Sequence, residues 1–335
     1  MMFSRKGWIK IAVTLFIGIG LVIALGQSDV VSFHARKGVA LGKALVGIDL
    51  SAQSSVPFRG RPFIRFAAIG DFGDSDNDAA TRAVADMVKS WNPDFVITVG
   101  DNNYPDGAAD TLDDNVGQYY SQFIYPYQGN YAPSEPPNRF FPVLGNHDWG
   151  SRNIQPYLDY FPINTSTTYT GSSGNERYYD FIEGPVHFFA LDSDSREPDG
   201  YTGWSPQAQW LRKELTDSVV PWQLVFLHHA PYSSGARHGS SESLQWAFAS
   251  WGVDAVIAGH DHVYERIEQD NIPYFVNGLG GRPLRGFGSP VAGSQVRYSD
   301  DYGAMLIEAT PDEITFSFYA VADGGTLIDS YTLSK

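Results

Sequence analysis

Five short blocks in this sequence carry the side chains best suited to chemistry. Each block is built on Asp, Asn or His, and together they contain carboxylates, an amide, a phenol and imidazoles. Such a mixed set of oxygen and nitrogen donors suits iron, zinc or manganese better than it suits metals that prefer thiolates. The blocks are GDFGD (Gly70–Asp74), GDNNY (Gly100–Tyr104), GNHD (Gly145–Asp148), HHAP (His228–Pro231) and GHDH (Gly259–His262).

Every block comes directly after a run of apolar residues that is typical of a buried strand. Open α/β sheets bind ligands at the carboxyl ends of their strands, so these polar side chains are expected to converge at one edge. The ligands suffice for two metal ions, and paired metals are typical of hydrolysis at phosphorus. The predicted strands are Ile64–Ile69, Phe95–Val99, Phe141–Leu144, Leu224–Leu227 and Val253–Ala258.

The elements between the blocks alternate between helices and strands in the first part of the chain. Apolar residues at helical spacing predict helices over Asp78–Trp91 and Pro206–Leu215, and a third over Thr111–Tyr125. From Tyr274 onward the pattern changes to strands separated by turns. The sequence therefore predicts a mixed α/β sandwich, without fixing its strand order.

Composition and charge limit the classes of function. The chain has 335 residues, of which 43% are hydrophobic and 18% charged, as expected for a globular protein with a substantial core. Its net charge of −15 repels phosphate backbones, which argues against polymeric nucleic acid as a partner. The absence of Cys excludes disulfides and thiolate metal sites.

The N-terminal segment has the pattern of an export signal. Arg5, Lys6 and Lys10 flank an uncharged apolar run over Ile11–Leu25, and small residues follow it. We expect residues 1–27 to be either a cleaved signal peptide or an uncleaved membrane anchor, and residues 28–61 to be a linker. The predicted location is outside the cytoplasm: periplasmic, secreted, or held on the outer side of a membrane.

In order and spacing, the five blocks resemble the calcineurin-like metallophosphoesterase superfamily. Tyr104 narrows the resemblance to the purple acid phosphatases, especially the small tartrate-resistant type. The resemblance covers roughly residues 62 to 333. It implies a four-layer α/β/β/α sandwich of two mixed β-sheets with flanking helices, and a catalytic domain over residues 62–335.

The resemblance also implies a role for each residue of the blocks. The first metal would be Fe(III) and the second a divalent ion, Fe, Zn or Mn. The ligands of the first metal would be Asp71, Asp101, Tyr104 and His262, and those of the second Asp101, Asn146, His229 and His260. His147 and His238 would face the phosphoryl group of the substrate.

Residues next to the predicted ligands receive simpler interpretations. Asp74 is predicted to cap a turn, and Asp148 to orient the ring of His147. His229 is chosen over His228 because, in the family, one residue separates the metal-binding His from a Pro. His228 is then a packed residue or one that supports a ligand. His187 lies in an apolar run and is predicted to be a core histidine.

The activity implied by the resemblance is hydrolysis of small phosphate monoesters by a metal-activated hydroxide. A divalent-metal phosphodiesterase or nucleotidase on the same fold is the nearest alternative. A non-catalytic, envelope-tethered binding protein is a more distant one. The loops Pro105–Asp110, Asn164–Asn175 and Gly280–Gly293 are expected to shape substrate choice, and the second of these is predicted to lie near the mouth of the site.

Overall fold

The computed structural model describes residues 60–150, 153–166 and 168–335. The predicted signal or anchor over residues 1–27 lies outside this part of the chain, as does nearly all of the predicted linker over residues 28–61. No helix among the described residues is both long enough and apolar enough to cross a lipid bilayer.

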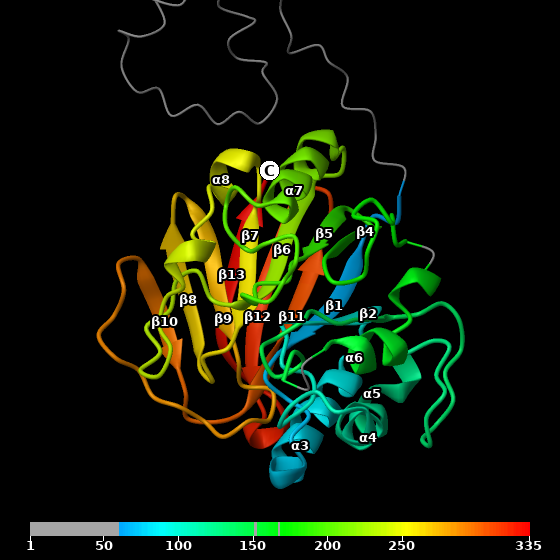
Figure 1. Cartoon of the computed structure of the whole chain (residues 1–335). Coiled ribbons are helices and arrows are strands. Elements are labelled where there is room, and N and C mark those ends of the chain that lie inside the picture. Colours follow the sequence, from blue (N-terminus) through cyan, green and yellow to red (C-terminus); the bar gives the residue numbers. More distant parts are fainter. Residues whose placement is uncertain (1–59, 151–152, 167) are drawn as a thin grey trace, which may run out of the picture. The chain divides into compact units, whose positions relative to one another are not determined.

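The described residues fold around two mixed β-sheets. The first sheet has six strands in the order β13-β12-β11-β1-β2-β3, and β1, β2 and β3 run parallel (Figure 1). β11 joins β1 in antiparallel pairing, as do β12 and β13 beyond it. The strands are β1 (Ile64–Ile69), β2 (Phe95–Thr98), β3 (Phe140–Phe141), β11 (Gly303–Ala309), β12 (Glu313–Ala320) and β13 (Thr326–Ser334).

The second sheet has seven strands in the order β10-β8-β9-β7-β6-β5-β4. Its centre, from β5 through β6 and β7 to β9, is parallel, and both edges are antiparallel. The strands are β4 (Tyr179–Glu183), β5 (Val186–Ala190), β6 (Trp222–His229), β7 (Ala255–Gly259), β8 (Tyr264–Gln269), β9 (Ile272–Asn277) and β10 (Ser294–Tyr298).

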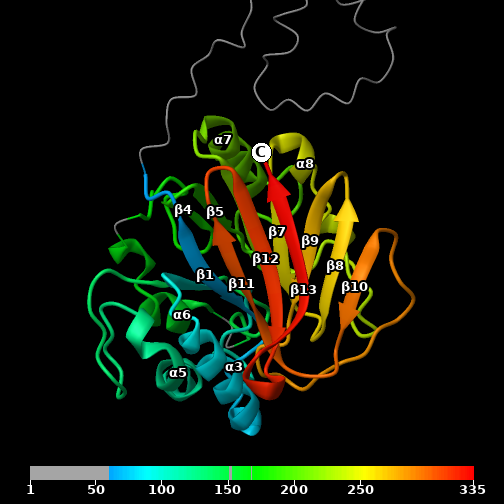
Figure 2. The same ribbon diagram turned by 180° about the vertical axis from the view of Figure 1, so that it is seen from behind.

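Helices flank both sheets. α7 starts where the Ser205 side chain accepts a hydrogen bond from Ala208 N–H, with Pro206 in the first turn, and its Leu211 and Leu215 pack against the second sheet. Turned by 180°, Figure 2 shows α3 and α5 beside the first sheet. The helices are α3 (Asp78–Ser90), α4 (Ala109–Leu112), α5 (Gln118–Tyr120), α6 (Gln155–Tyr160), α7 (Pro206–Asp217) and α8 (Phe248–Trp251). The predicted four-layer α/β/β/α sandwich is confirmed.

Aromatic rings fill the space between the sheets. Phe66 on β1 stacks on Phe95 at 5.0 Å between ring centroids, and it meets the edges of Phe188 and Phe226 from the second sheet. All four side chains are buried. These rings join the two sheets, so that strand ends from both can contribute to one site.

We expect Phe66→Ala to lower the free energy of unfolding by about 3–5 kcal/mol, because it removes a fully buried ring and leaves a cavity between the sheets. Urea denaturation followed by far-UV circular dichroism would measure the change. Val219→Ala is the matched control, since Val219 is 91% exposed and its truncation should cost less than about 0.5 kcal/mol. Equal losses in the two variants would contradict this account of the core.

The helix predicted over Thr111–Tyr125 is broken into short pieces. α4 and α5 are separated by a π-helical turn over Asp113–Gly117, and a 3-10 turn over Ser121–Phe123 follows α5. At Gly117 a Cβ would lie 2.2 Å from the Asp113 carboxylate, which also accepts hydrogen bonds from two tyrosines. Tertiary contacts of Asp113 therefore override the local helical pattern.

The first part of the loop over Asn164–Asn175 lies away from the predicted ligands. Ser166 and Thr168 line a hollow together with Asp94 and Phe95, at the start of β2. The predicted ligands follow the opposite ends of the strands. Thr170 and Ser172 bond to Asp180 on β4, so this part of the loop is held against the edge of the second sheet.

Candidate metal centre

The five blocks of the sequence come together where the parallel strands of both sheets end. Asp71 follows β1, Asp101 follows β2, and Asn146 lies in the turn after β3. His228 is the next-to-last residue of β6, and His260 directly follows β7. The first sheet thus supplies the acidic donors and the amide, and the second sheet supplies imidazoles.

Two glycines of the blocks allow the strand ends to approach each other closely. A Cβ at Gly145 would lie 2.2 Å from the carboxylate of Asp101, and one at Gly259 would lie 2.5 Å from the carboxylate of Asp71. Any side chain at these positions would push a carboxylate aside. The two glycines therefore leave the space that the carboxylates of Asp101 and Asp71 occupy.

Three of the predicted ligands have strained backbone conformations. Asp71, Asp101 and His260 have φ values of 55°, 53° and 71°, in the left-handed region that non-glycine residues rarely adopt. Such conformations persist only where the surrounding structure holds them, and they cluster at functional sites. Here they turn side chains at strand ends toward a common point.

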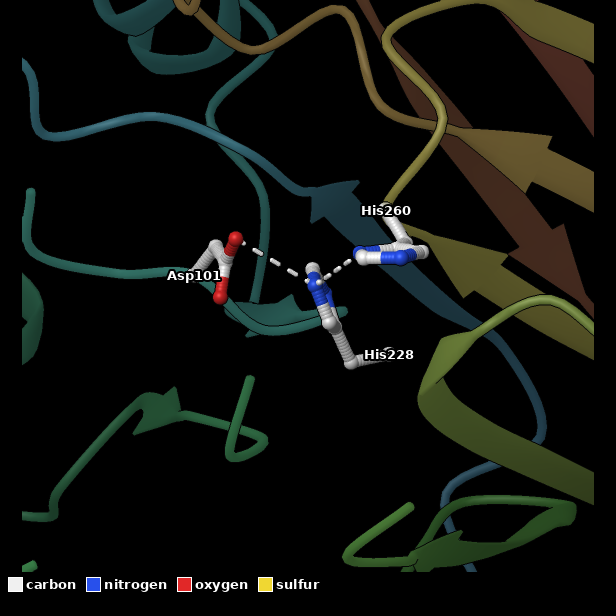
Figure 3. A group of neighbouring side chains, drawn as sticks. All are labelled: Asp101, His228 and His260. Carbon is white, nitrogen blue, oxygen red and sulfur yellow. Dashed lines mark hydrogen bonds and ion pairs between the residues drawn. The ribbon is translucent and has the colours of Figure 1, made fainter. Parts of the chain in front are cut away.

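The first group of donors surrounds His228 (Figure 3). Its Nε2 lies 3.3 Å from Asp101 Oδ2, 3.1 Å from His260 Nδ1 and 3.1 Å from Asn146 Oδ1. On the other side of the ring, Nδ1 donates to the carbonyl of Val99 at 2.8 Å, which leaves Nε2 as the atom facing the other donors. Metal-binding histidines usually have such a backbone partner, because it fixes the tautomer and the ring orientation.

The second group of donors surrounds Asp71. The Tyr104 hydroxyl lies 3.3 Å from Asp71 Oδ1 and donates to Asp101 Oδ2 at 2.9 Å. His262 Nε2 is 3.6 Å from Asp71 Oδ1, and its Nδ1 donates to the carbonyl of Pro283. Asp101 contacts both groups, so its carboxylate is the shared member between them.

The structure places both neighbouring histidines beside the other predicted donors. His228, which we interpreted as a packed residue, is fully buried among the donors Asp101, Asn146 and His260. Nδ1 of His229 instead meets the hydroxyl of Ser193 at 2.9 Å, and its ring lies beside His260 at 4.4 Å between centroids. Of the two histidines, His228 is the one that contacts Asn146.

The two histidines predicted to face the substrate lie at the solvent side of the donors. His147 is partly exposed and His238 is exposed. Nδ1 of His147 donates to the Pro105 carbonyl, and its Nε2 points back to Asp101 Oδ2 at 3.9 Å. The His238 ring lies 3.9 Å from the ring of His260. Both imidazoles are thus next to the donors and open to a ligand.

Two carboxylates near these histidines have positioning roles. Asp148 does not contact the His147 ring, contrary to the prediction. It accepts from the backbone N–H groups of Asn102 and Gly145 and so ties two of the blocks together. Asp261 is buried and accepts from the N–H of His238 at 3.2 Å and from that of Gly239 at 3.0 Å, which fixes the loop that carries His238.

Some contributors to the site carry no motif. Ser193 binds His229, while Arg196 donates to the carbonyls of Asn146 and Trp149 and thereby holds the turn after β3. Arg282 lies over the ring of Tyr104. None of the three lies in a block, and no spacing in the sequence singles them out.

Two simpler predictions agree with the structure. Asp74 caps the turn at Ser75–Asn77, and His187 is buried and bonded to Asp180.

Burial and mutual proximity shift the titration of these donors. Burial opposes a charge on His228, but Asp101 and Asp71 outweigh it and raise the pKa of His228 to about 10. Burial lowers the pKa of His262 to about 4, and burial together with His228 does the same for His229. Burial and the two carboxylates raise the pKa of Tyr104.

This electrostatic pattern fits a cation site. Two buried carboxylates lie close together, and their charge favours a proton on His228. Metal binding displaces protons from its ligands, so a bound ion would take over the role of this proton. The oxygen and nitrogen donors match iron, zinc and manganese.

The two-sheet sandwich and its donors at five strand ends define the class of protein. This is the architecture of a dinuclear metallophosphoesterase, an enzyme that hydrolyses phosphate esters. The sequence matches the calcineurin-like phosphoesterase family over residues 64–264, and the chain belongs to this family.

Relatives with assigned names agree with this class. Tartrate-resistant acid phosphatase type 5 of Mus musculus is 24% identical over 328 residues, covering 86% of this chain and 95% of that protein. The purple acid phosphatase PPD1 from yellow lupin seeds has a TM-score of 0.64 at 20% identity, covering 83% of this chain and 55% of that one. GAP50, the anchor in the inner membrane complex of Plasmodium, has a TM-score of 0.60 at 21% identity, covering 82% of this chain and 89% of that one. The two solved structures show a shared fold.

Proposed function

We propose that this protein is a purple-type acid phosphatase that hydrolyses small phosphate monoesters, with Fe(III) as one of its two metals. One observation carries the proposal. The phenol of Tyr104 lies within hydrogen-bonding distance of both Asp71 and Asp101, so an ion held by these carboxylates would meet the phenol oxygen as well. Phenolate is a strong ligand for ferric iron. The name of the mouse relative, a tartrate-resistant acid phosphatase, supports the same activity.

The donor groups suggest which residues would hold each metal. Asp71, Asp101, Tyr104 and His262 would hold the ferric ion. Asp101, Asn146, His228 and His260 would hold a divalent ion, so that we propose His228 in the place first given to His229. When bound, such ions supply Lewis acidity and lower the pKa of water, which is the chemistry that phosphate-ester hydrolysis requires.

His147 is suited to deliver a proton to the leaving group. Its Nδ1 proton is committed to the Pro105 carbonyl, so Nε2 is the atom that can take up and release a proton on the side of the donors. General acid catalysis by a positioned histidine is typically worth about 10²–10⁴-fold in rate. His238, whose backbone is anchored by Asp261, would donate a hydrogen bond to a phosphoryl oxygen.

Export of the protein is also a proposal. It rests on the N-terminal pattern alone: three cations before an apolar run that ends near small residues. Depending on whether this segment is cleaved, the enzyme would be released or held at the outer side of a membrane.

We expect the oxidised protein to be purple and the Tyr104→Phe variant to lose the colour, because the colour arises from charge transfer between phenolate and ferric iron. The measurement is the visible absorption spectrum of protein whose metals have been quantified. In the purple wild type, removal of the metals with a chelator should abolish both the band and hydrolysis of a phosphate monoester. A wild type that holds two metals but has no band would favour the divalent phosphodiesterase or nucleotidase, which hydrolysis of diesters and nucleotides near neutral pH would then test.

A further inference from the structure

Arg282 covers one face of the Tyr104 ring. The guanidinium carbon lies 4.2 Å from the ring centroid, well inside the distance at which a cation and an aromatic face attract each other. The ring itself is 2% exposed, so little water competes for this contact. Arg282 and Tyr104 are far apart in the sequence, and their contact is a product of the fold.

Two further contacts fix the position of Arg282. Its guanidinium forms an ion pair with Asp74, whose residue is only 5% exposed. The backbone N–H of Arg282 donates to the carbonyl of Asp71 at 2.9 Å, so the loop that carries Arg282 is joined to the end of β1. Arg282 is thus held through both its side chain and its backbone, which keeps the guanidinium over the ring.

Asp74 is the residue that makes this arrangement possible. Its carboxylate accepts from the N–H of Asp76 and so caps the short turn after the first block. That cap places the carboxylate beneath the loop of Arg282. The first block therefore contributes the donor Asp71. It also contributes Asp74, which holds Arg282 over a second donor, Tyr104.

We infer that Arg282, clamped by Asp74, is a positioning residue that fixes the Tyr104 ring and withdraws electron density from its phenolate. The inference rests on the proposed ferric site. A cation over the face of a phenolate stabilises the electrons that the phenolate donates to a metal. Charge transfer from the ring to Fe(III) then requires more energy, and the ring becomes a weaker donor to the oxidised ion.

The test compares Arg282→Gln with Arg285→Gln in protein loaded with metal. Arg285 is the matched control for charge near the site. It lies on the same loop, and its backbone N–H donates to the carbonyl of His262, but it has no ring contact or ion pair within the part of the chain described by the structure. We expect Arg282→Gln to move the visible band to longer wavelength and to lower the Fe(III)/Fe(II) reduction potential. Arg285→Gln removes the same charge without removing a ring contact, so it should move the band less than Arg282→Gln does. Asp74→Asn, which keeps a capping oxygen but frees the guanidinium, should shift the band in the same direction by a smaller amount.

The outcomes separate this inference from the proposed function. A purple wild type with unchanged band and potential in Arg282→Gln would overturn the inference and leave the phosphatase proposal intact. A band that shifts equally in Arg285→Gln would also overturn it, since net charge and not stacking would be the cause. A wild type without any band would contradict the ferric site itself.

A measurement on metal-free protein keeps the positioning claim testable in that last case. The near-UV circular dichroism of wild type minus that of Tyr104→Phe reports how rigidly the Tyr104 ring is held. We expect this difference signal to shrink when the same subtraction is made in an Arg282→Gln background. An unchanged signal would show that Arg282 does not position the ring.

Discussion

His228→Ala is expected to lose one of two bound metal ions, and its turnover should fall by roughly 10³-fold. The reason is that a Lewis-acid metal supplies several kcal/mol to the reaction, and each 1.36 kcal/mol changes the rate tenfold. His228 is the imidazole whose Nε2 meets Asp101, Asn146 and His260, while its Nδ1 is fixed by the Val99 carbonyl. Elemental analysis and steady-state kinetics with a phosphate monoester would measure the two effects.

His229→Ala is the matched control for that experiment. His229 contacts Ser193 and the ring of His260, which makes it a residue that supports a ligand. Losing such support typically costs about 10- to 100-fold in activity or affinity, so both metals should remain at saturating concentrations. If His229→Ala instead loses a metal while His228→Ala keeps two, the assignment from the sequence is right and the one from the structure is wrong.

Asp101→Asn should remove most of the activity, by more than roughly 10³-fold, and should lower the occupancy of both metals. The Asp101 carboxylate contacts side chains of both donor groups, Tyr104 on one side and His228 on the other. An amide of the same shape has no negative charge and offers one oxygen in place of two. Metal content and turnover would be measured on the same preparation.

Asp113→Asn distinguishes a loss of the metal centre from a loss of stability. Asp113 accepts hydrogen bonds from Tyr127, Tyr160 and Asn130, none of which is a predicted ligand. We expect this variant to be less stable by about 1–3 kcal/mol but to keep both metals. Unchanged metal content in Asp101→Asn, measured beside it, would contradict the shared role of Asp101.

Tyr104 and Asn146 illustrate how much of the site could be predicted from the sequence. Both residues follow predicted strands, and the structure places them among the donors, next to Asp101 and His228 respectively. Apolar runs followed by polar blocks were sufficient to predict this placement, because the carboxyl ends of parallel strands lie at the same edge of a sheet. The positions of these two residues at strand ends could therefore be predicted from local sequence.

Strand alternation could not decide between His228 and His229. β6 pairs with β7 in regular register as far as Phe226, and the register then shifts before His229. Such an irregularity changes which side chain turns to which face, and it depends on contacts with the neighbouring strand. The histidine that faces Asn146 was therefore set by pairing between distant segments.

The sequence by itself determined the class of fold, the five strand ends and the chemical kinds of donor, because periodicity and polar blocks after apolar runs are local properties. The tertiary structure decided that His228 contacts Asp101 and Asn146, that Asp148 ties blocks together, and that Arg282 lies on Tyr104. These contacts join segments far apart in the chain. They arise only when both sheets pack together, and no spacing along one strand records them.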